Sequence, residues 1–130
     1  MKYKEERIKK LIVEEILKII VNREVKDPRI STLLTVTNIT LSKDLHYCHL
    51  YFTVIGSESD RKKTLSGLNS AAPFFQKLIG ERLKLRFTPK IEFRYDEEVE
   101  KAYRVDKILS ELAKEREDKE KRQTESNENL

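Results

Sequence analysis

The first part of the chain carries an apolar pattern with helical spacing, which extends over residues 4–22. Its aliphatic side chains recur every three or four residues, and this spacing indicates the buried face of an amphipathic helix. The face consists of Ile8, Leu11, Ile12, Ile16, Ile19 and Ile20. Pro28 disfavours a helical backbone at Asp27, so the helix should end before that point and residues 25–30 should connect it to a strand.

Two segments with the alternating pattern of β-strands follow this connection. Residues 33–41 are rich in β-branched side chains, and the side that carries the apolar residues changes near Thr37 and Asn38. Such a change indicates a β-bulge or a twist. Residues 47–55 alternate regularly, and the polar connection between the two segments predicts an antiparallel hairpin. One side of the second strand carries Cys48, Leu50, Phe52 and Val54.

Two consecutive helices are predicted next. Ser57 and Asp60 have the spacing of a capping box, with aspartate in place of the preferred glutamate, so a helix should begin there. Proline removes a backbone donor and clashes with the preceding turn, so this helix must kink or restart at Ala71, Ala72 and Pro73. The apolar face of the second helix consists of Phe74, Phe75, Leu78, Ile79 and Leu83.

The rest of the chain predicts one more strand, one more helix and a tail. The strand alternates apolar with charged residues, and its apolar positions are Ile91, Phe93 and Tyr95. The helix extends over residues 99–112 and carries Val105, Ile108, Leu109 and Leu112 on one side. Residues 114–130 are highly charged and are expected to be disordered from about residue 116, because they cannot bury enough apolar surface. We therefore predict one α+β domain over residues 1–113, followed by this tail.

Charge is distributed unevenly along the chain. Residues 1–96 contain 19 Lys and Arg and 12 Asp and Glu, a net charge of +7, whereas residues 97–130 contain 8 and 11, a net charge of −3. A basic body favours a polyanionic partner such as a nucleic acid. Ordinary solubilising charge would give the same composition, so both interpretations are open at this point.

The cysteine content and the N-terminal residues bear on the cellular environment. Cys48 is the only cysteine, so an internal disulfide and a thiolate metal cluster are excluded. The first residues are charged, and no apolar run approaches the roughly 20 residues that span a bilayer. We therefore expect a soluble, cytoplasmic protein without a membrane partner.

Several short motifs occur in a defined order along the chain: residues 24–30 (Glu-Val-Lys-Asp-Pro-Arg-Ile), Val36-Thr37, Ser42-Lys43-Asp44-Leu45, Leu85-Arg86, Pro89 and Asp96. In this order and at these spacings they resemble the ribosome-binding factor A family, over roughly residues 4–112. The resemblance implies a type II KH-like fold with the order α-β-β-α-(kink)-α-β. In that fold, helices cover one face of a three-stranded sheet, and here a C-terminal helix follows.

The same resemblance implies a function. It leads us to expect binding to free 30S ribosomal subunits and assistance in the late maturation and processing of 16S rRNA, with importance in the cold. It further implies a monomeric, cytoplasmic, RNA-binding protein that uses no cofactor, metal or small-molecule substrate.

The kink departs from the pattern of the family. Ordinary KH domains grip nucleotides with a Gly-x-x-Gly loop between two helices, but the glycines here, at positions 56, 67 and 80, do not have that spacing. The resembled family has an Ala-x-Gly kink instead; Ala71 matches its alanine, and Pro73 stands where its glycine is expected. The ordinary gripping mode should therefore be absent, and the kink is interpreted either as a bend required by packing or as part of the site.

Basic residues in the second half of the domain are the candidates for rRNA contact, because cations neutralise phosphates. Two further cations in loops, Arg29 and Lys43, could extend this surface. The alternative interpretation is a solvated helix face. The candidates in the main stretch are Lys77, Arg82, Lys84, Arg86, Lys90 and Arg94, with Lys77 and Lys84 expected on one helix face.

Two other groups of residues allow two interpretations each. Tyr47, His49 and Tyr51 share one side of a strand and could stack on bases, although tyrosine is common on any exposed strand. Asp27 or Pro28 could fix the turn while Arg29 pairs with a carboxylate, or Arg29 could reach rRNA.

Evidence for catalysis is weak. Cys48 and His49 point to opposite sides of their strand, which disfavours a Cys–His nucleophile pair, and His46 brings no further metal ligands at a suitable spacing. No phosphate-binding glycine loop follows a strand. We therefore expect a protein that is not an enzyme. The alternatives to an assembly factor are a generic KH-like RNA-binding module and a protein-interaction domain that pairs through the third strand or the hairpin edge.

Overall fold

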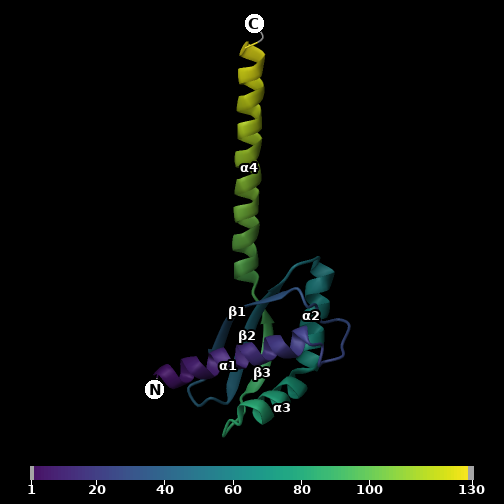
Figure 1. Ribbon diagram of the computed structural model, residues 1–130, viewed down its shortest axis with the longest axis vertical. Coiled ribbons are helices and arrows are strands. Elements are labelled where there is room, and N and C mark those ends of the chain that lie inside the picture. Colours follow the sequence, from purple (N-terminus) through teal and green to yellow (C-terminus); the bar gives the residue numbers. More distant parts are fainter. Residues whose placement is uncertain (1, 129–130) are drawn as a thin grey trace. The chain divides into compact units, whose positions relative to one another are not determined.

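The computed structural model describes residues 2–128, apart from the side chains of residues 2, 3, 105–107, 120 and 122–128. The chain forms two compact units, Met1–Asp96 and Glu97–Leu130. The elements follow the predicted α+β order, which confirms the fold class (Figure 1). They are α1 (Lys2–Val21), β1 (Leu34–Leu41), β2 (Tyr47–Val54), α2 (Glu58–Ser70), α3 (Ala72–Leu83), β3 (Lys90–Tyr95) and α4 (Glu97–Glu128).

The first unit is built on a three-stranded sheet with the order β1-β2-β3. β1 and β2 form the predicted antiparallel hairpin, and the register shifts between Val36 and Asn38, where the change of parity predicted a bulge. β3 pairs with β2 in parallel, as expected for a strand that returns after two helices.

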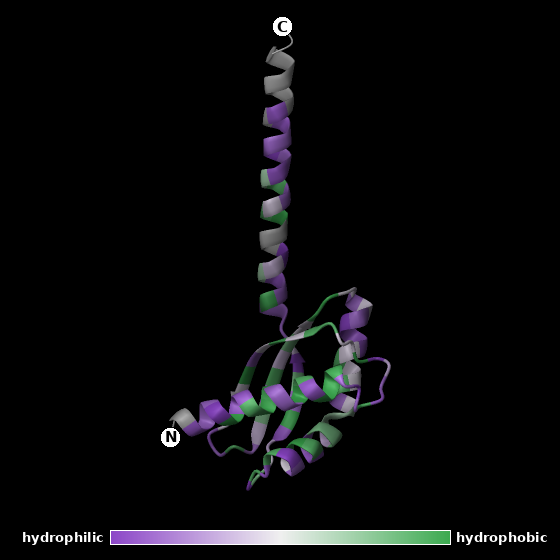
Figure 2. Ribbon diagram, in the orientation of Figure 1, coloured by the Kyte–Doolittle hydropathy of each residue, from purple (hydrophilic) through white to green (hydrophobic). Residues whose placement is uncertain are grey.

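The core lies between the sheet and the helices α1, α2 and α3. Figure 2 shows how apolar and polar residues alternate along α1, where Ile12, Ile16, Ile19 and Ile20 are buried and Val21, the last residue of the helix, is exposed. Because the helices cover only one face, the residues of β2 that alternate with the buried ones remain partly or largely exposed on the other. The fully buried residues include Ile12, Ile16, Ile19, Cys48, Leu50, Phe52, Leu68, Phe75 and Ile79.

The predicted break between two helices is present at Ala71. The capping box forms as expected: the Ser57 hydroxyl accepts from the backbone N–H of Asp60, whose carboxylate accepts from the backbone N–H of Ser57. α2 then ends at Ser70, and Ala71 serves as the cap of both helices. Pro73 lies in the first turn of α3, where a missing N–H leaves no helical bond unmade. Proline therefore begins a new helix here and does not bend a continuous one.

The connection between α1 and β1 packs tightly on α2. A Cβ atom at Gly67 would lie 2.9 Å from Cγ1 of Ile30, so only glycine allows this approach. The buried Thr64 hydroxyl donates to the backbone carbonyl of Arg29 (3.3 Å) and accepts from the backbone N–H of Ser31 (3.4 Å). These contacts attach the loop to the helix.

The tail differs from its prediction. α4 is continuous from Glu97 to Glu128, and it includes the described part of the segment for which disorder was expected; residues 129–130 of that segment lie outside the described residues. The compact units also divide after Asp96 and not after residue 113. The physical reason is composition: no proline follows Pro89, lysine, arginine and glutamate favour helix, and pairs such as Arg104 with Glu100 (2.7 Å) support it.

The apolar side predicted for the last helix is uncovered where it is described. Ile108, Leu109 and Leu112 of α4 are all exposed, whereas the side chain of Val105 lies outside the described residues. None of the described helices combines the length and the apolar character needed to cross a membrane.

Candidate nucleic-acid interface

The eight cations predicted to contact rRNA fall into two groups. Arg29, Arg82 and Arg94 each form an ion pair with a carboxylate of the first unit. The other five are exposed, and none of them forms an ion pair among the residues that the structure describes: Lys43, Lys77, Lys84, Arg86 and Lys90. Cations without a protein partner are the ones free to neutralise phosphates.

Arg82 connects α3 to the N-terminal part of the chain. Its Nη1 atom lies 3.0 Å from Oε2 of Glu24 and 3.4 Å from Oε2 of Glu15, and its Nη2 atom contacts the other oxygen of Glu24. The hydrogen bonds from Arg82 hold the pKa of Glu24 below its ordinary value. This geometry shows a residue that links two helices.

Arg29 is held by the carboxylate two residues before it. Its Nη2 atom donates to Asp27 (2.7 Å), its backbone N–H also donates to Asp27 (3.0 Å), and Nη1 reaches the Ser66 hydroxyl on α2 (3.1 Å). The side-chain bond from Arg29 is the main reason why the pKa of Asp27 is lowered. Arg29 is therefore paired with a carboxylate, as the structural interpretation of this residue expected, and that carboxylate is Asp27.

Four of the unpaired cations, Lys43, Lys84, Arg86 and Lys90, lie at one end of the sheet, which we call the basic end. The hairpin loop between β1 and β2 and the connection between α3 and β3 both lie there (Figure 1). A backbone bond from the Lys90 N–H to the His46 carbonyl (2.7 Å) joins the two loops. The fifth, Lys77, lies on α3 beside a shallow depression that is also lined by Gly80 and Thr88.

The position of Lys84 differs from its prediction. It does not share a helix face with Lys77, because it is the C-cap of α3 and its backbone is left-handed (φ 51°, ψ 43°). This conformation ends the helix and turns the chain into the basic end. No glycine stands at this position to signal the turn.

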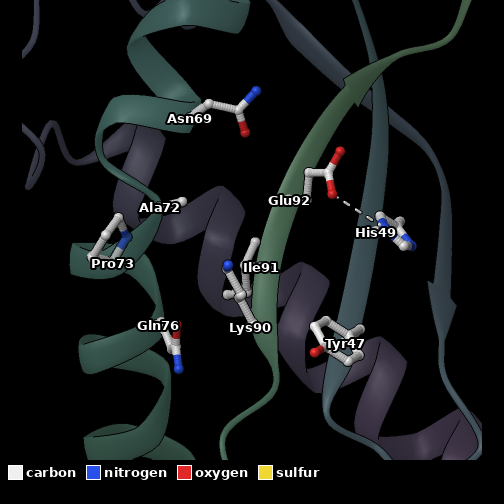
Figure 3. A pocket seen from close by; sticks show the side chains of 9 residues that line it. All are labelled: Tyr47, His49, Asn69, Ala72, Pro73, Gln76, Lys90, Ile91 and Glu92. Carbon is white, nitrogen blue, oxygen red and sulfur yellow. Dashed lines mark ion pairs between the residues drawn. The ribbon is translucent and has the colours of Figure 1, made fainter.

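A groove of about 380 Å³ runs beside the basic end, between the α2–α3 junction and β3 (Figure 3). Ala72, Pro73 and Gln76 line one wall, and Lys90 and Glu92 line the other. Two of the predicted kink residues therefore border the groove. Beyond β3, the groove reaches Tyr47 and His49 on the open face of the sheet.

The open face of the sheet is internally neutralised. His49 lies 3.3 Å from Glu92, and Arg94 lies 3.1 Å from another oxygen of the same carboxylate. The bond from Arg94, followed by the charge of Arg94 and then that of His49, lowers the pKa of Glu92. A phosphate would meet this carboxylate in the middle of the face, so the basic end is the better anion site.

Phe87 was not among the predicted site residues. It lies in the connection between α3 and β3, and 61% of it is exposed. The guanidinium carbon of Arg86 lies 5.6 Å from the centre of its ring, and the His46 ring meets it edge-on at 6.0 Å. The signal in the sequence was an aromatic residue that lies outside both the helical and the strand periodicity and is flanked by cations.

The single cysteine is placed poorly for nucleophilic chemistry. Cys48 is fully buried, and burial raises the pKa of its thiol to about 11, so at neutral pH it is almost entirely protonated. Among the described residues, no three histidine, cysteine, aspartate or glutamate side chains converge in a way that could hold a metal ion.

Comparisons with known proteins agree on one family. Residues 4–109 match the sequence pattern of the family described as ribosome-binding factor A. A ribosome-binding factor A from Dictyoglomus thermophilum is 46% identical over 112 residues, which cover 86% of this chain and 92% of that protein. A Thermotoga maritima protein solved by NMR is similar with a TM-score of 0.55 and 32% identity, over 72% of this chain and 83% of that one.

A third similarity concerns a complex. A homology model of the Thermus thermophilus ribosome-binding factor A, fitted into an electron cryo-microscopy map of its complex with the 30S subunit, is similar with a TM-score of 0.52. It is 28% identical in sequence, and the similarity covers 70% of this chain and 89% of that one.

Proposed function

Because this chain belongs to the ribosome-binding factor A family, we propose that it binds the free small ribosomal subunit and assists the late maturation and processing of 16S rRNA. The relative from Thermus thermophilus was fitted into a complex with the 30S subunit, which supports the same partner for this chain. The protein would act in the cytoplasm, and its importance would be greatest in the cold.

The observation that carries the proposal is the unpaired charge of the basic end. Lys43, Lys84, Arg86 and Lys90 are exposed in two loops or at their ends, and the bond between Lys90 and His46 joins these two segments. Neutralising phosphates releases counterions, so such a surface gains affinity for folded RNA without any sequence-specific contact. Positioning on a phosphate backbone is what a factor that recognises a large folded rRNA requires.

The proposed mechanism needs no covalent step. A protein that binds one conformation of immature rRNA more tightly than others shifts the population towards that conformation, by no more than the difference in binding free energy. RNA helices that are wrongly paired rearrange slowly at low temperature, so a shift of this kind matters most in the cold.

The test is co-sedimentation of the purified protein with ribosomal particles. The wild type should sediment with free small subunits and not with translating ribosomes. The double charge reversal K84E/R86E should abolish this association and leave the unfolding midpoint unchanged. The matched control is K62E/K63E, which makes the same change of charge on exposed residues of α2, near the other end of the sheet, and should retain association.

Salt dependence separates the proposal from its rivals. Each phosphate contact contributes about 0.7–0.9 to the slope of log affinity against log salt, so the neutral variant K84Q/R86Q should reduce the slope by about 1.4–1.8. A protein-interaction domain with an apolar interface would show almost no slope. A generic RNA-binding module would show the slope but would not sediment with free small subunits, and either result would contradict the proposal.

A further inference from the structure

Phe87 is held in an exposed position by neighbours that are themselves fixed. On one side Lys84 caps α3 in a left-handed conformation, and on the other Pro89 is fully buried. Thr88 packs so closely on α3 that a Cβ at Gly80 would lie 2.5 Å from its hydroxyl oxygen. The segment between these anchors therefore presents the ring of Phe87 to the solvent, while the core is filled by other phenylalanines such as Phe52, Phe75 and Phe93.

The surroundings of the ring are polar and mostly cationic. Arg86 contacts the ring, and Lys84 and Lys90 lie within three residues of it along the chain. The His46 ring meets its edge, and Nδ1 of His46 lies 3.2 Å from Asp44, the one carboxylate of the hairpin loop. Most of the ring area is nevertheless uncovered.

The isolation of the ring indicates the chemistry of its partner. Protein-docking surfaces expose contiguous apolar area, but Tyr47 is the one other large exposed hydrophobic residue at this end of the sheet among those described. Leu33 and Ile55 lie at the opposite end. A single aromatic ring among cations is the arrangement by which proteins bind unpaired nucleotides: the ring stacks on a base and the cations hold the backbone.

We propose that Phe87 is a stacking residue for an unpaired nucleobase of the rRNA, with Lys84 and Arg86 holding the phosphates on either side. This inference rests on the proposed function and adds to it that the contacted rRNA is locally single-stranded at the basic end. A fully paired helix offers phosphates to the cations but no base face to the ring.

The test uses the full-length protein and a short single-stranded oligoadenylate that carries one 2-aminopurine, whose fluorescence is quenched by stacking. The wild type should bind this RNA with quenching, and more tightly than a duplex of the same length. F87A should weaken binding by a factor of about 5 to 150 and remove the quenching, because that is the usual effect of deleting one stacking aromatic residue. F87Y should bind like the wild type.

Two further readouts distinguish stacking from other roles. F87A removes no charge, so its salt slope should equal that of the wild type, whereas K84Q/R86Q should reduce the slope. F87L keeps the apolar volume but not the aromatic face, so it should behave like F87A. If F87L bound small subunits like the wild type while F87A did not, the ring would be an apolar anchor for a protein, and the proposal would be wrong.

Failure of this inference differs from failure of the proposed function. If F87A and F87L bound the oligoadenylate like the wild type while K84E/R86E failed to bind small ribosomal subunits, stacking would be refuted and rRNA binding would stand. If K84E/R86E also continued to bind small ribosomal subunits, the basic end would not be the rRNA site and both proposals would fail. Unfolding midpoints of all variants should match the wild type, because Phe87 lies outside the core.

Discussion

Asn69 gives the sharpest test of how the sheet is held against the helices. β3 is an edge strand, and the side-chain amide of Asn69 on α2 makes both bonds with Phe93: Nδ2 donates to its carbonyl (3.1 Å) and Oδ1 accepts from its N–H (3.0 Å). An asparagine thus occupies the place of a neighbouring strand. Replacing it with alanine should leave two backbone groups of β3 without a protein partner.

The cost of N69A can be worked from these two bonds. Each contributes about 0.5–1.5 kcal/mol net, and alanine returns up to about 0.7 kcal/mol through its higher helix propensity. Asn69 is exposed, so water replaces part of what is lost, and we expect a destabilisation of about 1–1.5 kcal/mol. With a urea dependence of about 1–3 kcal/mol per molar, the unfolding midpoint should fall by roughly 0.3–1.5 M.

Hydrogen exchange localises the effect. The Lys90 amide donates to His46, the residue before β2, and the Asp96 amide donates to Phe52 of β2. Alternation along the strand therefore directs the Arg94 amide to β2 and the Phe93 amide to Asn69. In N69A, exchange of the Phe93 amide should accelerate beyond the change caused by global destabilisation, and that of Arg94 should not.

The control is the neighbouring variant S70A, because the Ser70 side chain makes no hydrogen bond among the described residues. It should change stability by less than about 0.5 kcal/mol. If N69A unfolded at the same urea concentration as S70A, and the Phe93 amide exchanged as in the wild type, the amide would not be holding the strand and the reasoning would fail.

Two further predictions concern the ion pair on α3 and the last helix. R82Q should destabilise the fold most at neutral pH, because Arg82 lowers the folded-state pKa of Glu24. This stabilisation is present above the ordinary glutamate pKa of 4.5 and is lost as the pH falls through the folded-state pKa. The urea midpoints of R82Q and the wild type should therefore converge in acid. R82Q should still sediment with small subunits. If it did not, Arg82 would belong to the proposed rRNA site. A113P should lower the helical ellipticity of the chain, since proline interrupts α4; an unchanged spectrum would indicate that this segment is disordered in solution.

Periodicity was enough to predict most of the fold. The bulge between Val36 and Asn38, the capping box at Ser57 and the break at Ala71 were all visible, because each depends on residues within one short segment. The extent of α4 to Glu128 did not follow from periodicity. The small number of apolar residues after residue 113 favours disorder, whereas lysine, arginine and glutamate, with no glycine or proline between them, favour helix locally.

The candidate site was harder to predict, because the availability of a charge is a tertiary property. Arg82 and Lys84 are two residues apart in the sequence, yet Arg82 is paired with Glu24, which lies 58 positions away, and Lys84 is unpaired among the described residues. Nothing in the local sequence separates them. Of the eight cations predicted to contact rRNA, the five without an ion pair among the described residues are Lys77 on α3 and the four of the basic end, where the Lys90 N–H bonds to the His46 carbonyl. The position of the proposed rRNA surface therefore depends on which acids the fold brings to the arginines. A variant that removed both Glu15 and Glu24 would free Arg82 and should enlarge that surface, which a steeper salt dependence of small-subunit association would reveal.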